Sequence, residues 1–436
     1  MRLTGGTPLK GLRAWILHRL VANYWSLPAV AVIAAPIVAA LVLWADRAGA
    51  GAWVFARGLN LLVAADTAQD LAIAIVGIDA AFLTLYWSVT LIVLTLATGH
   101  LGVRLVDRWL DKGLVRLSMA GLTFCLVFSI IVLARLDPEA QLSALPHFAL
   151  AAMFVLQLFN LGMLGVAIHD LGRTMFVDRS IAHVGAAAAE VTLRLDAREA
   201  FDGPWSYVLP TPREGYVEGV DLARLRELVP DHCQAIRICA PPGSHVLDGE
   251  PIALFASRPD DFDAIGKAIA IGDFRSGVQS TVFEVRLLVE VAARALSPGI
   301  NDFYSALACA DRLAAAMAGQ AVNWVDEGQA SCWADDPRFE LPGQDFRGLF
   351  DAPLDQFRQA AADYPSVSIR MIENYGRLYA LLAAGDASPN LLAFLRQRAQ
   401  ELSAHAADNA EHRKDRTAIE QAYLRFDDAS PLKVAA

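Results

Sequence analysis

The stretch AAFLTLYWSVTLIVLTLATGHLGV, residues Ala80–Val103, contains no Asp, Glu, Lys or Arg. A helix rises about 1.5 Å per residue, so a run of this length can cross a hydrocarbon core about 30 Å thick. Three further uncharged apolar stretches occur at Val21–Ala45, Leu117–Ala134 and Ala140–His169. The chain up to His169 therefore predicts four transmembrane helices.

No comparable stretch follows, so the remainder of the chain is expected to fold in water. The predicted fold class is a membrane α-helical bundle of four transmembrane helices, joined to an α+β cytoplasmic domain. We expect the spans at about residues 21–45, 74–98, 116–134 and 147–169. The predicted domains are a transmembrane domain at 1–180, a small β-rich, barrel-like subdomain at 181–260 and a helical α+β subdomain at 261–436.

Charge is distributed unevenly along the chain. Residues 1–180 hold 13 Lys and Arg against 10 Asp and Glu, whereas residues 181–436 hold 24 against 37. Phosphate binding depends on clustered Lys and Arg, so the acidic C-terminal part argues against a nucleic-acid partner. The partner expected for the N-terminal, membrane-spanning part is the lipid bilayer.

The positions of Lys and Arg also predict an orientation. Four precede the first span, two lie in the first loop, four in the second and one in the third. Cytoplasmic loops carry the excess of Lys and Arg, so we expect the N-terminus and the C-terminal domain in the cytoplasm. Residues Met1–Arg19 show no convincing cleavage site, which predicts an uncleaved first span in a bacterial inner membrane.

The second span has one face of small and hydroxylated residues. Spacings of three, four and seven residues return to the same side of a helix. Close helix packing is the first interpretation, because small residues let backbones approach, and a pore or substrate lining is the alternative. The residues of this small/hydroxyl face are Gly77, Ala81, Thr84, Ser88 and Thr95.

Asp79 is the acidic residue nearest to this span. A carboxylate at the centre of a bilayer costs about 2.5–3.5 kcal/mol on the insertion scale, so such residues are functional candidates. If the span begins at Ala80, however, Asp79 lies at the interface and is hydrated. Both positions, intramembrane and interfacial, remain open. In the fourth span Gly162, Gly165 and His169 share a face with Asn160 nearby, which favours a packing seam.

Between residues 205 and 255 the apolar residues no longer follow helical spacing. Short segments typical of β-strands occur there instead, separated by Pro and Gly. Gly243–Ile252 is similar to the Gly-rich hairpin of lipoyl and biotinyl half-barrels, although no Lys occupies a modification turn. This similarity is the basis for expecting a small barrel. The predicted strands are Trp205–Leu209, Tyr216–Val220, Ala235–Cys239 and Ile252–Phe255.

Residues 262–320 are predicted to be helical, with a corner at Ser297-Pro298-Gly299-Ile300-Asn301-Asp302. Pro298 disfavours helix at Ser297, and Asn301 or Asp302 can cap the next helix. A turn between helices is one interpretation. The other is a polar pocket in which an anion meets arginines and backbone amides at the helix start. The candidate pocket residues are Arg275, Glu290, Arg294, Ser297, Asn301 and Asp302.

The sequence contains no P-loop, dinucleotide-binding, nucleophile-elbow or HExxH pattern, so we expect no enzyme activity and no cofactor. Zinc-ligand side chains occur close together in the sequence at His232, Cys233, Cys239 and His245. Their spacing, however, fits no common zinc knuckle. We therefore expect no metal, and buried thiols at the five cysteines.

Two segments carry a resemblance to a known family. They are Ser88–Leu105, within and after the second span, and Arg294–Asp302, with the sequence RALSPGIND. Together they resemble the bacterial membrane proteins grouped as domain of unknown function 2254, over roughly residues 15–425. The chain has Val103 and Phe303 where many relatives have Pro. The resemblance implies the topology and no particular reaction.

The leading functional hypothesis is an oligomeric inner-membrane channel or transport-type protein for a small ion. In this hypothesis the small/hydroxyl face of the second span lies nearest the conduction path, and the cytoplasmic domain serves assembly and gating. Four spans enclose little space, so we expect a homo-oligomer. The alternative is a membrane-anchored sensor or scaffold that binds a partner or a small anion through its cytoplasmic domain.

Overall fold

A computed structural model describes residues 26–58, 65–101, 113–137, 139–174, 177–273 and 281–427. The described residues form two compact units, which divide between residues 176 and 177. The first unit is the helical bundle, and the second contains every strand of the described chain. Each unit is considered on its own below.

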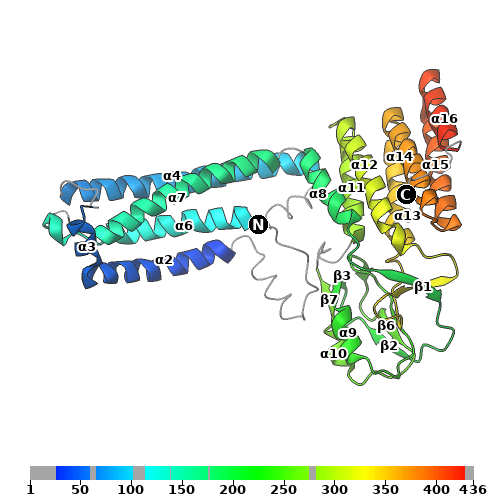
Figure 1. The fold of residues 1–436 in the computed structure, drawn as a ribbon, viewed down its shortest axis with the longest axis horizontal. Helices are drawn as coiled ribbons and strands as arrows, with labels where there is room; N and C mark the ends of the chain where they lie inside the picture. The colour runs from blue at the N-terminus through cyan, green and yellow to red at the C-terminus, as the bar shows by residue number, and fades with distance from the viewer. Residues whose placement is uncertain are drawn as a thin grey trace. The chain divides into compact units, whose positions relative to one another are not determined.

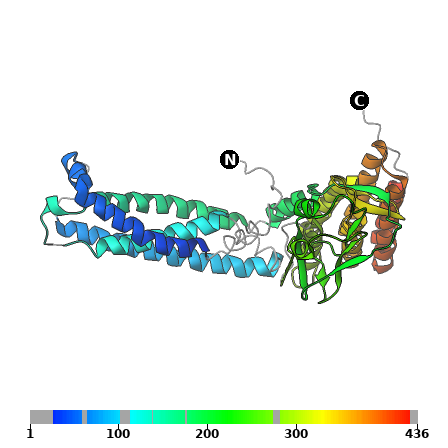
Figure 2. The ribbon, with the colours of Figure 1, turned by 90° about the horizontal axis from the view of Figure 1, so that it is seen from below.

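The first unit contains four helices of membrane length, and the predicted number is confirmed. The helices of the unit are α2 (Ser26–Ala45), α3 (Gly51–Ala56), α4 (Ala65–Leu101), α6 (Gly113–Leu133) and α7 (His147–Thr174). The candidate spans are Ser26–Ala56, Asp66–Leu96, Gly113–Leu133 and His147–Gly172. Figures 1 and 2 show α2, α4, α6 and α7 running alongside one another.

Helix α6 is the central helix of this bundle. Half of its span is buried, against 17% to 22% of the other three spans. Small residues allow the close approach of its neighbours, since Ala35 and Ala39 of α2 and Ala72 of α4 are fully buried in one cluster with Phe128. Such packing by small side chains is the main source of helix association in lipid.

Asp46 fixes one end of the bundle. It lies in a short π-helical turn, Asp46–Ala50, and its carboxylate accepts backbone N–H groups from Phe148 (3.1 Å) and Ala149 (2.7 Å). These amides belong to the first turn of α7, which has no partners for them within the helix. Asp46 therefore caps α7 from a distant position earlier in the chain.

The second unit is an α/β structure with two sheets and surrounding helices (Figure 1). Its helices are α8 (Val177–Ala189), α9 (Leu222–Leu228), α10 (Phe262–Gly266), α11 (Thr281–Ala295), α12 (Phe303–Gln320), α13 (Phe346–Ala361), α14 (Pro365–Ala384), α15 (Pro389–Asn409) and α16 (Arg413–Asp427). Its strands are β1 (Leu195–Glu199), β2 (Tyr207–Pro210), β3 (Gly215–Val220), β4 (Ile236–Ile238), β5 (His245–Val246), β6 (Pro251–Phe255), β7 (Ile269–Gly272), β8 (Gln329–Trp333) and β9 (Phe339–Glu340).

The strands form two open sheets, with the orders β1-β8-β9-β4-β6-β2 and β5-β3-β7. Strands β4 and β9 pair in parallel, and the other pairs are antiparallel. Val217, Phe255 and Phe339 from both sheets are fully buried in one core with Leu225 of α9 and Ile265 of α10. The larger sheet thus combines strands from before residue 260 and after residue 320.

The expected barrel-like subdomain is wrong, although strands are present near the predicted positions. No closed barrel occurs in the described residues, because β3 pairs with β5 and β7 while β4 pairs with β6 and β9. The segment similar to a lipoyl hairpin, Gly243–Ile252, places β5 and β6 in different sheets. The uniformly helical prediction for 262–320 is also wrong, since β7 pairs with β3 there.

Candidate intramembrane site

Asp79 lies in the core of the helical bundle. Its side chain has no exposed surface, and it accepts hydrogen bonds from two other helices. Ser129 Oγ of α6 donates to Asp79 Oδ2 at 2.8 Å, and Asn160 Nδ2 of α7 donates to Asp79 Oδ1 at 3.5 Å. Ser129 is 2% exposed and Asn160 is fully buried. The intramembrane site, as defined here, consists of Asp79, Ser129 and Asn160.

The position of Asp79 along α4 favours the intramembrane alternative. The candidate span Asp66–Leu96 extends by several helical turns to either side of Asp79. At about 1.5 Å per residue, the carboxylate lies about 20 Å from the start of the span. Charge-assisted hydrogen bonds offset part of the cost of burying a carboxylate, and here two donors lie against its two oxygens.

Residue spacing explains why these three helices bring their polar groups together. On α6, Cys125 and Ser129 are four residues apart and share the buried face, as do Leu122 and Ser118 further along the helix. Asn160 is the buried polar residue of α7 at the same level. Ser129 was not identified from the sequence, because its only signal is a hydroxyl in an uncharged run that also contains Ser118 and Thr123.

The small/hydroxyl face of α4 points away from this core. Gly77, Ala81, Thr84, Ser88 and Thr95 are all exposed in the single chain. Thr84 Oγ1 donates to the Ala80 carbonyl and Thr95 Oγ1 to the Leu91 carbonyl, each at 2.8 Å. Both hydroxyls are thus paired within their own helix, so the face can meet lipid or a second copy without an unsatisfied polar group at these two positions. The structure does not place it in an interhelical seam of one chain.

The corner between α11 and α12 brings together most of the candidate pocket residues. Arg294 Nη2 lies 3.8 Å from Glu290 Oε1, and Ser297 Oγ donates to the Arg294 carbonyl at 2.6 Å. Asp302 caps α12 by accepting the Ser305 backbone N–H at 3.1 Å. Asn301 adopts a positive φ of 51°, which turns the chain. These contacts stabilise a turn between helices.

Arg275, the remaining candidate for that pocket, lies outside the described residues. The anion-pocket hypothesis therefore stays a prediction.

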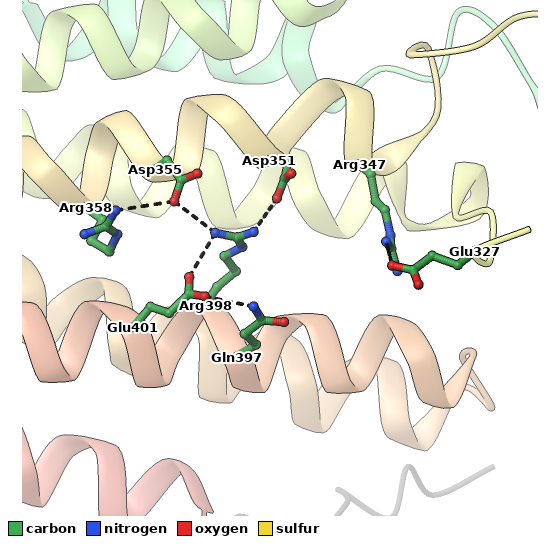
Figure 3. Close-up of polar contacts among 8 residues, drawn as sticks. All are labelled: Glu327, Arg347, Asp351, Asp355, Arg358, Gln397, Arg398 and Glu401. Atoms are coloured by element: carbon green, nitrogen blue, oxygen red, sulfur yellow. Dashed lines mark hydrogen bonds and ion pairs between the residues drawn. The ribbon is translucent and has the colours of Figure 1, made fainter.

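An ion-pair network that the sequence did not reveal joins α13 to α15. The Arg398 side chain is 13% exposed and contacts Asp351, Asp355 at 3.0 Å and Glu401 at 2.9 Å (Figure 3). Arg358 also reaches Asp355, at 3.6 Å. One largely buried guanidinium thus holds carboxylates from two helices, which is a structural role. Closer to the strands, Arg347 pairs with Glu327 in the same view.

The cysteines and histidines do not gather into a metal site in the described residues. Cys233 faces the Ala235 carbonyl, while His245 lies 3.1 Å from Glu214. Burial raises the pKa of the Cys332 thiol to about 11, so this thiol is protonated at neutral pH. A protonated, buried thiol is a poor nucleophile.

Comparison with known proteins identifies the family. A family model described as "Predicted membrane protein (DUF2254)" matches residues 22–376. The chain belongs to this family. The match covers the four candidate spans, the intramembrane site and the α11–α12 corner, and family 2254 carries no assigned reaction in its description. No curated protein and no solved structure matches the chain.

Proposed function

We propose that this member of family 2254 is a transport-type membrane protein, an oligomeric channel or transporter for a small ion. The observation that carries the proposal is Asp79, a fully buried carboxylate with hydrogen-bond donors from two other helices inside a candidate span. Ionisable residues inside membranes are rare and costly, and they mark ion pathways and proton relays. An apolar residue would pack there at lower cost.

The proposal includes assembly of several copies through the small/hydroxyl face of α4. Gly77 has no neighbouring atom within 4 Å of the position that a Cβ would take, so another helix can approach closely. The spacing of Gly77, Ala81, Thr84 and Ser88 is that of small residues at helix–helix contacts in lipid. The second unit then serves assembly and gating, with both chain ends in the cytoplasm of a bacterium.

Flux through the reconstituted full chain tests the proposal. Purified protein in liposomes should carry at least one of H⁺, Na⁺, K⁺ or Cl⁻ faster than empty liposomes. Asp79→Asn should reduce this flux at least tenfold. Asp70→Asn is the matched control, because Asp70 is an exposed carboxylate on the same helix. No flux above empty liposomes for any of the four ions would refute the transport function.

The oligomer is tested separately. Thr84→Leu with Ser88→Leu should shift the detergent-solubilised protein from its oligomer toward monomer, measured by light scattering. The matched control is Leu85→Phe with Leu96→Phe, an enlarged pair of exposed residues on α4 that lies to one side of this face. An unchanged mass for the Thr84/Ser88 variant would remove this face from the proposed contact.

A further inference from the structure

Buried polar side chains continue along the bundle core beyond the intramembrane site. On α4, Asp79, Tyr86 and Thr90 follow each other at spacings of seven and four residues and are 0%, 1% and 3% exposed. These spacings keep all three on one face. Ser118 of α6, which is fully buried, lies near Tyr86, and its hydroxyl has no hydrogen-bond partner within the described residues. The polar groups thus extend from Asp79 toward the Leu101 end of α4.

Several polar atoms of this core have no partner within the described residues. They include Asn160 Oδ1, Gln157 Oε1, Ser118 Oγ and Thr90 Oγ1. A buried polar atom without a partner costs about as much as a lost hydrogen bond, so helix packing alone does not account for these atoms. Asn160 is fully buried and Thr90 is 3% exposed. Among these residues Asn160 contacts Asp79, so an unused acceptor lies beside the buried carboxylate, and a protonated carboxyl can donate to it.

The geometry around Asp79 restricts the size of any ligand. Ser129 Oγ lies 2.8 Å from one carboxylate oxygen, and Asn160 Nδ2 lies 3.5 Å from the other. Because Asp79 has no accessible surface, no water-sized space adjoins its oxygens, and a Na⁺ or K⁺ ion could reach them only if neighbouring atoms moved. A proton needs no additional volume, and the protonated carboxyl can donate to a neighbouring acceptor.

We infer that Asp79 is a proton-binding site, and that the ion moved under the proposed function is H⁺. The claim that H⁺ is transported rests on the proposed function. The claim that Asp79 binds a proton rests only on the geometry of the site. The carboxylate accepts one proton to become a neutral carboxyl, and it releases the same proton to complete the step. The other titratable groups facing this part of the core are Cys125 of α6, Tyr86 of α4 and Asp170 of α7.

Infrared difference spectroscopy on the full chain in phosphatidylcholine liposomes tests proton binding directly. An acid step should produce a protonated-carboxyl stretch that is absent from Asp79→Asn and retained in Asp70→Asn. Ser129→Ala keeps the carboxyl and should keep the band, which controls for a general disturbance of the core. Identical difference spectra for the wild-type chain and Asp79→Asn, with both eluting as one folded species, would overturn the inference.

A pH-sensitive dye inside the same liposomes separates the two claims. Proton flux lost at least tenfold in Asp79→Asn supports both. Flux of Na⁺, K⁺ or Cl⁻ without proton flux would overturn the transported ion and leave the transport function standing. An Asp79-dependent band without flux of any tested ion would refute the transport function and retain the proton site.

Discussion

The hydrogen bond between Ser129 and Asp79 provides a quantitative test of the intramembrane site. Both residues are buried, and the 2.8 Å bond joins a hydroxyl to a carboxylate. A hydrogen bond to a charged group contributes about 1.5–3 kcal/mol. A neutral bond between membrane helices contributes about 0.6 kcal/mol on average. Ser129→Ala should therefore cost about 1.5–3 kcal/mol in the wild-type background and about 0.6 kcal/mol in Asp79→Asn.

The difference between the costs of Ser129→Ala in the two backgrounds is a coupling energy of about 1–2 kcal/mol in a double-mutant cycle. It can be measured by reversible unfolding of the detergent-solubilised chain in increasing SDS, followed by tryptophan fluorescence. The matched control is Thr123→Val on the same helix, because Thr123 Oγ1 donates only to its own Met119 carbonyl at 2.8 Å. Thr123→Val should show no coupling to residue 79.

The coupling should also shrink at acidic pH, where a protonated carboxyl makes only neutral hydrogen bonds. Effects of Ser129→Ala and Asp79→Asn that add to within about 0.3–0.5 kcal/mol at neutral pH would refute the reasoning, because independent sites behave in that way.

Three further changes follow from contacts in the two units. Asp46→Ala removes the cap of α7 and should lower the free energy of unfolding by about 1 kcal/mol, measured in SDS; no loss would contradict the capping role. Arg398→Leu leaves three carboxylates without their shared partner and should clearly lower the melting temperature measured by circular dichroism. The control is Arg425→Leu, which removes an exposed ion pair at 3.7 Å and should lower the free energy of unfolding by less than about 1 kcal/mol. Equal effects of the two would rule out the network as a major contributor. Hydrogen bonds from Trp324 and Asn390 lower the pKa of Asp326 in the folded chain. The ionised Asp326 therefore stabilises the fold above the ordinary aspartate pKa, and this contribution is lost as the pH falls through the lowered pKa of the folded chain. Acid unfolding of Asp326→Asn should therefore show less loss of stability over that window, and an unchanged acid profile would contradict the assignment.

The four membrane spans could be predicted from the sequence, whereas the contacts between them could not. Uncharged runs such as Ala80–Val103 predict spans because charged residues are costly in lipid. This reasoning does not depend on how the helices pack. The second span was expected at about residues 74–98, and the helix that contains this segment begins earlier. Helix α4 begins at Ala65 and carries Asp66 and Asp70 on exposed positions, so Asp79 lies well inside it.

The convergence of the three site residues could not be derived from spacing alone. Ser129 and Asn160 lie 50 and 81 positions from Asp79. Their contact depends on how α4 and α7 pack against α6, and periodicity within one helix carries no information on that. Asp79 itself was identifiable, because an acid beside an apolar run is rare.

In the second unit, short strands were predictable and their partners were not. Turn residues and β-branched residues marked β3, β4 and β6 near their true bounds. Register and sheet membership depend on pairing with distant strands such as β9, which a local pattern cannot reveal. Helices α13 and α14 are separated just before Pro365, which begins α14 because Pro is favoured in the first helical turn.

Labelling of single cysteines in intact membranes tests the central claim most directly, that Asp79 lies in a closed core within the bilayer. In a background without the five native cysteines, Asp66→Cys and Asp79→Cys would be treated with a membrane-impermeant maleimide. Asp66 is exposed at the start of the span, so its cysteine should react, whereas the cysteine at position 79 should react only after denaturation in SDS. Equal rates at the two positions in intact membranes would contradict the account.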